Sequence, residues 1–289
     1  MLILHVVPVG LSLLDHIELP DSTITAREAL AWATGPTQEL DWQRLASAGL
    51  APVSVPEDSA AEWTSIAAVM REPRYASAGG EAYVFLATDT DDGVCAATLV
   101  AARYQHTTVH YLHEPLAARR RVLEPGDVYL CRIPDLDLGT IKPTSTTWRS
   151  LGAAGRLVAD TARQAGWQVI VHLSGGYKAM IPYLMVLAEG IHSVLCDVPL
   201  GEASPSQIRA VALHESSVRS GKPVVIDVAV RAVRGDLFDD VKELAAATRS
   251  GGESVGAGVA DDLLGLLIEE ASEQTRTLTE AGLIMVNVL

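Results

Sequence analysis

The chain has 289 residues, of which 48% are hydrophobic, and this is enough for one large domain or for one domain with a small appendage. Its formal net charge of −14 and its pI near 4.9 argue against general electrostatic binding of long nucleic acid, but they leave room for a local basic pocket that binds a small anion. Its three cysteines are widely spaced and form no C-x-x-C pair, which indicates a reducing compartment without a disulfide or zinc framework.

The sequence predicts neither a membrane anchor nor a signal peptide. We find no apolar run of membrane-spanning length, and the first residues lack the basic region and cleavage site of a signal peptide. We therefore expect a cytoplasmic protein without a membrane partner.

Short apolar runs that predict strands alternate with runs of helical periodicity. Strands are expected at 2–7, 81–87, 107–112, 127–133 and 169–173, and helices at about 25–34, 40–48, 57–70, 94–104, 151–165 and after residue 178. Later strand-like runs cover 193–196, 208–213 and 223–230, and the last of these suggest an antiparallel or edge addition. This alternation predicts an α/β fold with a doubly wound, mainly parallel, Rossmann-like sheet.

The character of the chain changes after residue 234. We expect helices at 237–247 and 261–271, and an apolar last segment that begins with an N-cap-like Thr279. The predicted organisation is therefore a main domain at 1–234 and a small C-terminal helical region at 235–289, for which a winged helix is one option.

The turn after the run 169–173 is the strongest candidate for a ligand site. It reads Ser174-Gly175-Gly176-Tyr177-Lys178 and leads into a helix. Glycines let the backbone approach a phosphate closely, and the first N–H groups and the dipole of the helix favour its negative charge. A lysine in the first helical turn gains nothing from the helix dipole, which favours a role toward a ligand. The alternative is an ordinary strand-to-helix turn with a solvated lysine, and the P-loop spacing is absent.

Two other turns follow predicted strands and belong to the same predicted edge of the sheet. After the first strand come Gly10, Leu11 and Ser12, where the serine is either a phosphate-binding hydroxyl or, as its position favours, an N-cap. After the run 81–87 the polar turn 88–90 either faces the same crevice or forms an Asx-rich helix entry.

Metal binding is not predicted. His106, His110 and His113 cluster near one expected strand, but the alternation of a strand points one of them away from the others. The aspartates at 89, 91 and 92 lack the remaining spacing and the closing glutamate of an EF-hand. We therefore expect neither a metal nor a cofactor.

The turns Val9–Leu14 and Ser174–Lys178 together resemble the paired motifs of the CARF (CRISPR-associated Rossmann fold) domain, which typically reads V-G-T-S-L first and T-G-G-[FY]-K later. The segment Phe85–Thr90 is similar to the intervening strand and turn of the CARF subgroup that contains the standalone ring nucleases. The segment Arg276–Gly282 resembles an L-T-x-x-G ending that is common after such domains. The resemblance covers about 1–230 in layout, and its specific content is the two short turns.

The chain departs from the family pattern within both turns. Leu11 stands where the family often has threonine, which removes one possible hydrogen bond to a ligand. Ser174 replaces the usual threonine of the second turn and keeps the hydroxyl.

The resemblance implies a receptor for a cyclic oligoadenylate, cyclic tetra-adenylate above all, held between the two subunits of a homodimer. It also implies that the ring is cut without a metal ion, through attack of a ribose 2′-OH that leaves a 2′,3′-cyclic phosphate. In this interpretation Lys178 stabilises the charge of the phosphate and Ser12 positions it. The implied ligand-binding residues are Gly10, Leu11, Ser12, Thr88, Asp89, Thr90, Ser174, Gly175, Gly176, Tyr177 and Lys178.

Two functions follow from the resemblance. Arg209 and His214 match the R-x(4–6)-H spacing of HEPN ribonucleases, but they fall in a predicted strand, and the C-terminal region is too small for the helical bundle of such an enzyme. This favours a self-contained ring nuclease that switches off type III CRISPR signalling. The alternative is a non-catalytic sensor that acts through its C-terminal region or a partner protein.

Overall fold

The computed structural model describes residues 2–15, 57–75, 79–104, 109–112, 122–136, 143–176, 178–196, 207–214, 217–218, 220–232, 240–241, 243–244, 246, 254–256, 267–272 and 275–289. The helices predicted at 25–34 and 40–48, the histidines at 106 and 113, and Tyr177 lie outside these residues.

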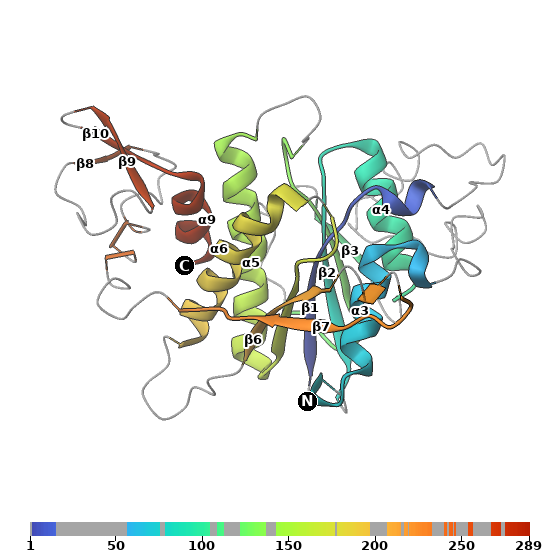
Figure 1. Ribbon diagram of the computed structural model, residues 1–289. Helices are drawn as coiled ribbons and strands as arrows, with labels where there is room; N and C mark the ends of the chain where they lie inside the picture. Colours follow the sequence, from blue (N-terminus) through green and yellow to red (C-terminus); the bar gives the residue numbers. More distant parts are fainter. Residues whose placement is uncertain are drawn as a thin grey trace.

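A seven-stranded sheet with the order β3-β4-β2-β1-β5-β6-β7 forms the centre of the fold (Figure 1). Its strands are β1 (Ile3–Pro8), β2 (Glu81–Ala87), β3 (Val109–Leu112), β4 (Val128–Arg132), β5 (Gln168–His172), β6 (Ile208–Leu213) and β7 (Val225–Val228). All neighbours are parallel except β6 and β7, which pair antiparallel at one edge. The predicted α/β fold with a mainly parallel sheet and an antiparallel edge addition is confirmed.

Helices cover both faces of the sheet. On one face lie α3 (Ala61–Arg71) and α4 (Asp91–Ala102); on the other lie α5 (Ser145–Ala165), α6 (Ile181–Cys196) and α9 (Glu280–Val288) (Figure 1). Short 3-10 turns accompany them at η1 (Ser12–Asp15), η2 (Glu57–Ser59), η3 (Pro73–Tyr75) and η5 (Lys178–Met180).

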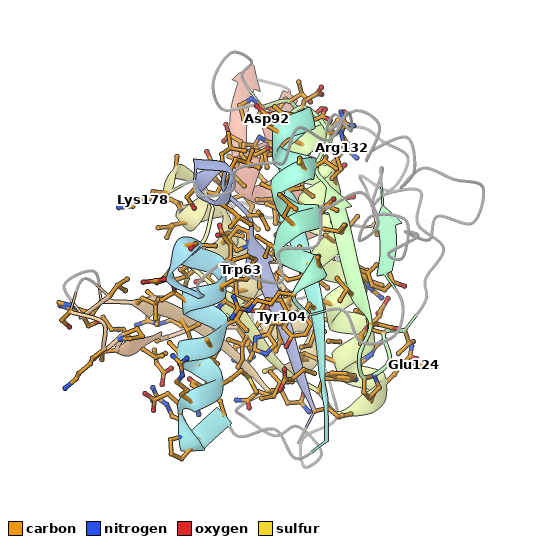
Figure 2. All side chains as sticks on the ribbon, turned by 90° about the vertical axis from the view of Figure 1, so that its right-hand side faces the viewer. Trp63, Asp92, Tyr104, Glu124, Arg132 and Lys178 are labelled. Carbon is orange, nitrogen blue, oxygen red and sulfur yellow. The ribbon has the colours of Figure 1, made fainter. Side chains whose placement is uncertain are left out.

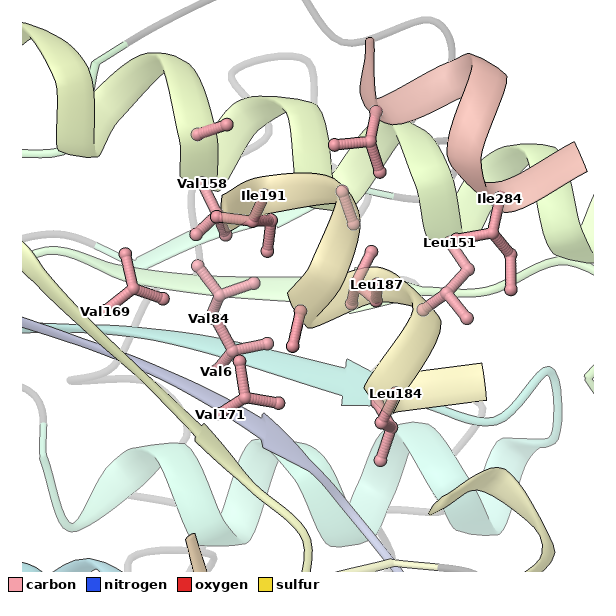
Figure 3. Close-up of a cluster of buried hydrophobic side chains, with 14 of the residues drawn as sticks. Val6, Val84, Leu151, Val158, Val169, Val171, Leu184, Leu187, Ile191 and Ile284 are labelled. Carbon is pink, nitrogen blue, oxygen red and sulfur yellow. The ribbon is translucent and has the colours of Figure 1, made fainter. Parts of the chain in front are cut away.

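The continuous apolar runs become strands because both of their faces are buried. Successive side chains of a strand point to opposite faces, so Val6 packs with the α5–α6 cluster while Val7 packs with the α3–α4 cluster. Figure 3 shows valines of the three neighbouring strands β2, β1 and β5 facing Leu184, Leu187 and Ile191 of α6.

The C-terminal residues contain strands as well as helix. A three-stranded antiparallel sheet in the order β8-β10-β9 comprises β8 (Ser254–Gly256), β9 (Ile268–Ser272) and β10 (Thr275–Leu278). The helix predicted at 261–271 is therefore wrong in its described part, since β9 starts at Ile268. A short apolar segment does not distinguish strand from helix by periodicity, and the pairing with β10 decides it here.

A second difference concerns the run 193–196, predicted as strand, which is the last turn of α6. Its residues continue the helical spacing of Leu187, Ile191 and Val194 against the core.

By length and composition alone, 178–196 is long and apolar enough to cross a membrane, so the expectation that no run reaches that length is wrong for this segment. Of the apolar stretch within this segment, 50% is buried inside the fold. Core helices of soluble proteins meet the same criteria of length and composition, so the finding is weak evidence for a membrane.

The last helix, α9, packs directly on α5 and α6 (Figure 1). Thr279 caps it as predicted, accepting a hydrogen bond of 3.0 Å from the Gly282 N–H. The approach to α5 is close: a Cβ added to Gly152 would lie 2.4 Å from the Ile284 carbonyl oxygen. The end of the chain thus contributes to the same core as β1 and β2.

This packing predicts that α9 unfolds together with the main sheet. Ile284→Ala, at a side chain with 0% exposure, should lower the free energy of unfolding of the whole protein by about 2–5 kcal/mol, because it leaves a cavity in the shared core. Urea denaturation followed by tryptophan fluorescence should show one shifted transition. An added early transition, with the main midpoint unchanged, would contradict this arrangement.

Candidate functional site

The two turns that the sequence analysis paired are in contact. β1 and β5 are parallel neighbours, so both turns leave the same edge of the sheet, at the carboxyl ends of the strands. A Cβ added to Gly10 would lie 3.2 Å from the Gly176 Cα, and Gly176 itself has φ near +70°, where side chains are disfavoured. The order of the strands also reverses here: β2 lies on one side of β1 and β5 on the other, and open α/β sheets bind ligands at such a switch point.

A carboxylate from α3 joins the two turns. Glu62 lies in the first turn of α3 with only 1% of its surface exposed. Its Oε1 accepts hydrogen bonds from the Gly10 N–H at 2.8 Å and from the Gly176 N–H at 2.9 Å. Gly175 completes the fit, because a Cβ there would lie 2.6 Å from the Pro8 carbonyl oxygen and 3.0 Å from the Glu62 Cγ.

Glu62 changes the predicted role of the glycine turns. The two backbone donors that the sequence analysis assigned to a ligand phosphate bind a carboxylate of the protein itself. The sequence offered no sign of this, because an acidic residue in a first helical turn is common for reasons of the helix dipole alone. Only the docking of α3 brings it to the turns.

A cavity of about 420 Å³ lies beside the second turn, between α3 and the ends of β5 and β6. Its walls are mostly apolar and include Leu173, Leu213 and Ile181, with polar groups from Thr64, Ser174 and Lys178. This size and this mixture are typical of pockets that bind small molecules.

Thr64 of α3 contributes one polar group to the cavity, and the others come from the second turn and from η5, which follows it. The Ser174 hydroxyl accepts the Leu213 N–H at 2.5 Å, which leaves its own proton available for donation. Lys178 is the first residue of η5 and lines the cavity. Figure 2 shows its side chain at the periphery of the molecule, directed away from the sheet.

The first turn lies next to this cavity without lining it. Gly10 is half-buried against Gly176, whereas Leu11 has 47% of its surface exposed and Ser12, at the start of η1, is also exposed. Among the described residues, those that line the cavity do not include Ser12. The two residues expected to act on the phosphate therefore belong to adjoining turns, but only Lys178 borders the cavity.

The turn 88–90 forms a helix entry, which was one of its two predicted roles. The Thr90 hydroxyl caps α4 by accepting the Gly93 N–H at 2.9 Å and lies 3.1 Å from the Thr88 hydroxyl. Asp89 pairs with Arg132 and accepts the Asp135 N–H at 2.8 Å. Thr88 also borders a small, mainly apolar cavity of about 20 Å³ at the end of β1. These polar atoms hold α4 and the loop after β4 in place.

A buried chain of three polar side chains lies beneath the site. The Ser65 hydroxyl of α3 is 2.8 Å from His172 Nδ1, and His172 Nε2 is 2.9 Å from His5 Nδ1. All three residues have 0% exposure, and the His5 ring stacks on Tyr83 with 5.0 Å between centroids. Burial lowers the pKa of His5 to about 3, and burial together with His5 holds the pKa of His172 well below its usual value. Both rings are therefore neutral at physiological pH.

Within the described parts of the chain, no group of three or more histidine, cysteine, aspartate or glutamate side chains is arranged to hold a metal ion.

No protein-family model matches the chain, and no curated protein matches it. The functional argument therefore depends on the residues and on their geometry.

The buried histidines predict a loss of stability in acid. Unfolded histidines have a pKa near 6.5, so below that pH the unfolded chain binds protons that the folded chain does not. Between pH 7 and pH 5 the two rings together should lower the free energy of unfolding by about 4 kcal/mol. His5→Phe, which keeps the stacking on Tyr83, should remove about half of that dependence. Urea titrations at several pH values measure it, and equal pH slopes for both proteins would contradict the assignment.

Proposed function

We propose that the chain binds a cyclic oligoadenylate, of the size of cyclic tetra-adenylate, at the carboxyl ends of β1 and β5 and cleaves it without a metal ion. The observation that carries this proposal is the contact between Gly10 and Gly176 beside a cavity lined by Ser174 and Lys178. The two turns that meet are the ones that resemble the paired motifs of CARF domains.

The chemistry of the cavity supports a nucleotide as the ligand. Its aliphatic walls suit the faces of an adenine, whereas the hydroxyls of Thr64 and Ser174 suit the polar edges of a base or a ribose. The ammonium of Lys178 supplies positive charge for a phosphate in a protein whose net charge is −14. A ring of repeated nucleotides would place one unit in each cavity of a homodimer, because a two-fold ligand fits a two-fold interface.

The proposed reaction is an internal transfer within the ligand. The ribose 2′-OH attacks the adjacent phosphorus and gives up its proton, the bond to the 5′-oxygen breaks, and that oxygen takes up a proton and leaves as a 5′-hydroxyl, so that a 2′,3′-cyclic phosphate remains. The protein has to hold the 2′-OH in line with the leaving oxygen and to stabilise the charge that develops on the phosphate. Since Glu62 takes the N–H groups of Gly10 and Gly176, we assign the charge to Lys178 and the positioning to the hydroxyls of Ser12 and Ser174.

Asp89 and Thr90 have no ligand contact in this proposal. Their side chains are engaged by Arg132, by the Asp135 N–H and by the Gly93 N–H, and releasing them would loosen α4.

Cleavage of the cyclic oligoadenylate would remove the second messenger of type III CRISPR immunity and so end the response.

Cleavage is tested by incubating the purified protein with cyclic tetra-adenylate in EDTA and separating the products by chromatography. We expect linear products with a 2′,3′-cyclic phosphate. Lys178→Ala should slow cleavage by about 10²–10³-fold, the scale of losing one charge-stabilising donor, and should weaken binding. Lys222→Ala, an exposed lysine in the turn before β7, is the matched control and should react like the wild type. Tight binding of an intact ring would indicate a sensor instead of an enzyme, and equal rates for both lysine variants would remove Lys178 from the mechanism.

The location of the ligand is tested by blocking the cavity from its rim. Val218 lines the cavity with 36% of its surface exposed, whereas Val224 of the same hairpin is 53% exposed and lies outside the lining. Val218→Trp should weaken binding of cyclic tetra-adenylate at least tenfold because the indole fills the space of the ligand, and Val224→Trp should not. Calorimetric titration measures both affinities. If the two variants bind equally well, the ligand lies elsewhere.

A further inference from the structure

The glycine turns and Glu62 together have the features of an occupied anion site. Two backbone N–H groups from separate turns converge on one oxygen, at 2.8 Å and 2.9 Å. Glycine at 175 leaves room for the carboxylate, since a Cβ there would lie 3.0 Å from Glu62 Cγ. The first turn of α3 adds the favourable end of a helix dipole. These are the elements that hold phosphates and carboxylates in ligand sites.

Glu62 Oε2 is buried and finds no hydrogen-bond partner among the described residues. Leaving a charged oxygen without a partner in the interior is unfavourable. A neutral amide or hydroxyl could link the two turns with a smaller free-energy cost of burial. The two convergent donors are better matched to an anion, because hydrogen bonds to charged acceptors are about twice as strong as neutral ones.

We propose that Glu62 is the resident anion of the cradle formed by Gly10 and Gly176: the protein contains an anion-binding site for a small carboxylate and fills it with its own side chain. An anionic ligand then meets the outer side of the turns, where Lys178 and Ser174 lie, and does not receive these two N–H groups. The inference is independent of which ligand the cavity binds.

Chemical rescue tests the proposal directly. Glu62→Ala removes the same heavy atoms that acetate contains, so acetate can refill the vacated site. The variant should melt about 5–10 °C below the wild type, because two half-buried donors lose their acceptor. Adding acetate at about 0.2 M should recover roughly 4 °C of that loss, as expected for a dissociation constant on the order of 10 mM. Differential scanning fluorimetry in sodium chloride of equal ionic strength provides the baseline.

Two matched controls separate anion binding from cavity filling and from general salt effects. Acetamide has nearly the same shape as acetate without its charge, and should recover much less. Ile66→Ala on the same helix, at a side chain with 1% exposure, loses packing without exposing the two donors, so acetate should not recover its melting temperature. Equal recovery with acetamide, equal recovery of Ile66→Ala, or no response to acetate would each overturn the proposal.

A variant that fails to fold is tested by refolding. Glu62→Ala is diluted from urea into acetate, acetamide or chloride, and the soluble yield is compared with that of the wild type in each solution. A yield that rises with acetate alone supports the resident-anion assignment, and equal yields in the three solutions contradict it. Neither measurement involves a nucleotide, so its outcome is distinguishable from a failure of the proposed function.

Discussion

The arrangement of the site depends on one buried carboxylate. Glu62 accepts the N–H groups of Gly10 and Gly176 and so ties the end of β1 to the end of β5. Without this acceptor, two half-buried N–H groups would lack a partner within the turns, and each would cost free energy comparable to a lost hydrogen bond. This pair of contacts holds together the two turns that the pairing of β1 and β5 brings to one edge, next to the cavity that Lys178 lines.

The helix that carries Glu62 connects the site to the core. Along α3, Ala61 and Thr64 line the cavity, Glu62 holds the turns, and Ser65 bonds to the buried His172. His172 in turn reaches His5 on the central strand. Direct contacts of α3 therefore connect the cavity wall with both turns and with the centre of the sheet. We regard α3, which the sequence analysis predicted only as a helix at 57–70, as the element that organises the edge of the sheet.

On the opposite face of the sheet, the last helix of the chain, α9, packs against α5 and α6. Glycines on α5 and α6 allow α9 to lie close: added Cβ atoms at Gly152, Gly155 and Gly190 would each lie 3.2 Å or less from an atom of α9. This packing buries Ile284 and Val288 in the same core as Val6 and Val84. A role for α9 in transmitting the presence of a ligand would act through this core, since α9 packs on α5 and α6 within it.

The amino-acid sequence alone determined the strands of the parallel sheet and the meeting of the two glycine turns. Runs such as 82–87 are apolar throughout because both faces of a central strand are buried, and parallel strands bring the turns that follow them to one edge. The tertiary structure decided what those turns bind. The contacts of Glu62 with Gly10 and Gly176, and the chain from Ser65 to His5, join residues far apart in sequence, and such contacts leave no periodic pattern. β9 was missed for the same reason: its strand conformation comes from pairing with β10 and not from its own residues.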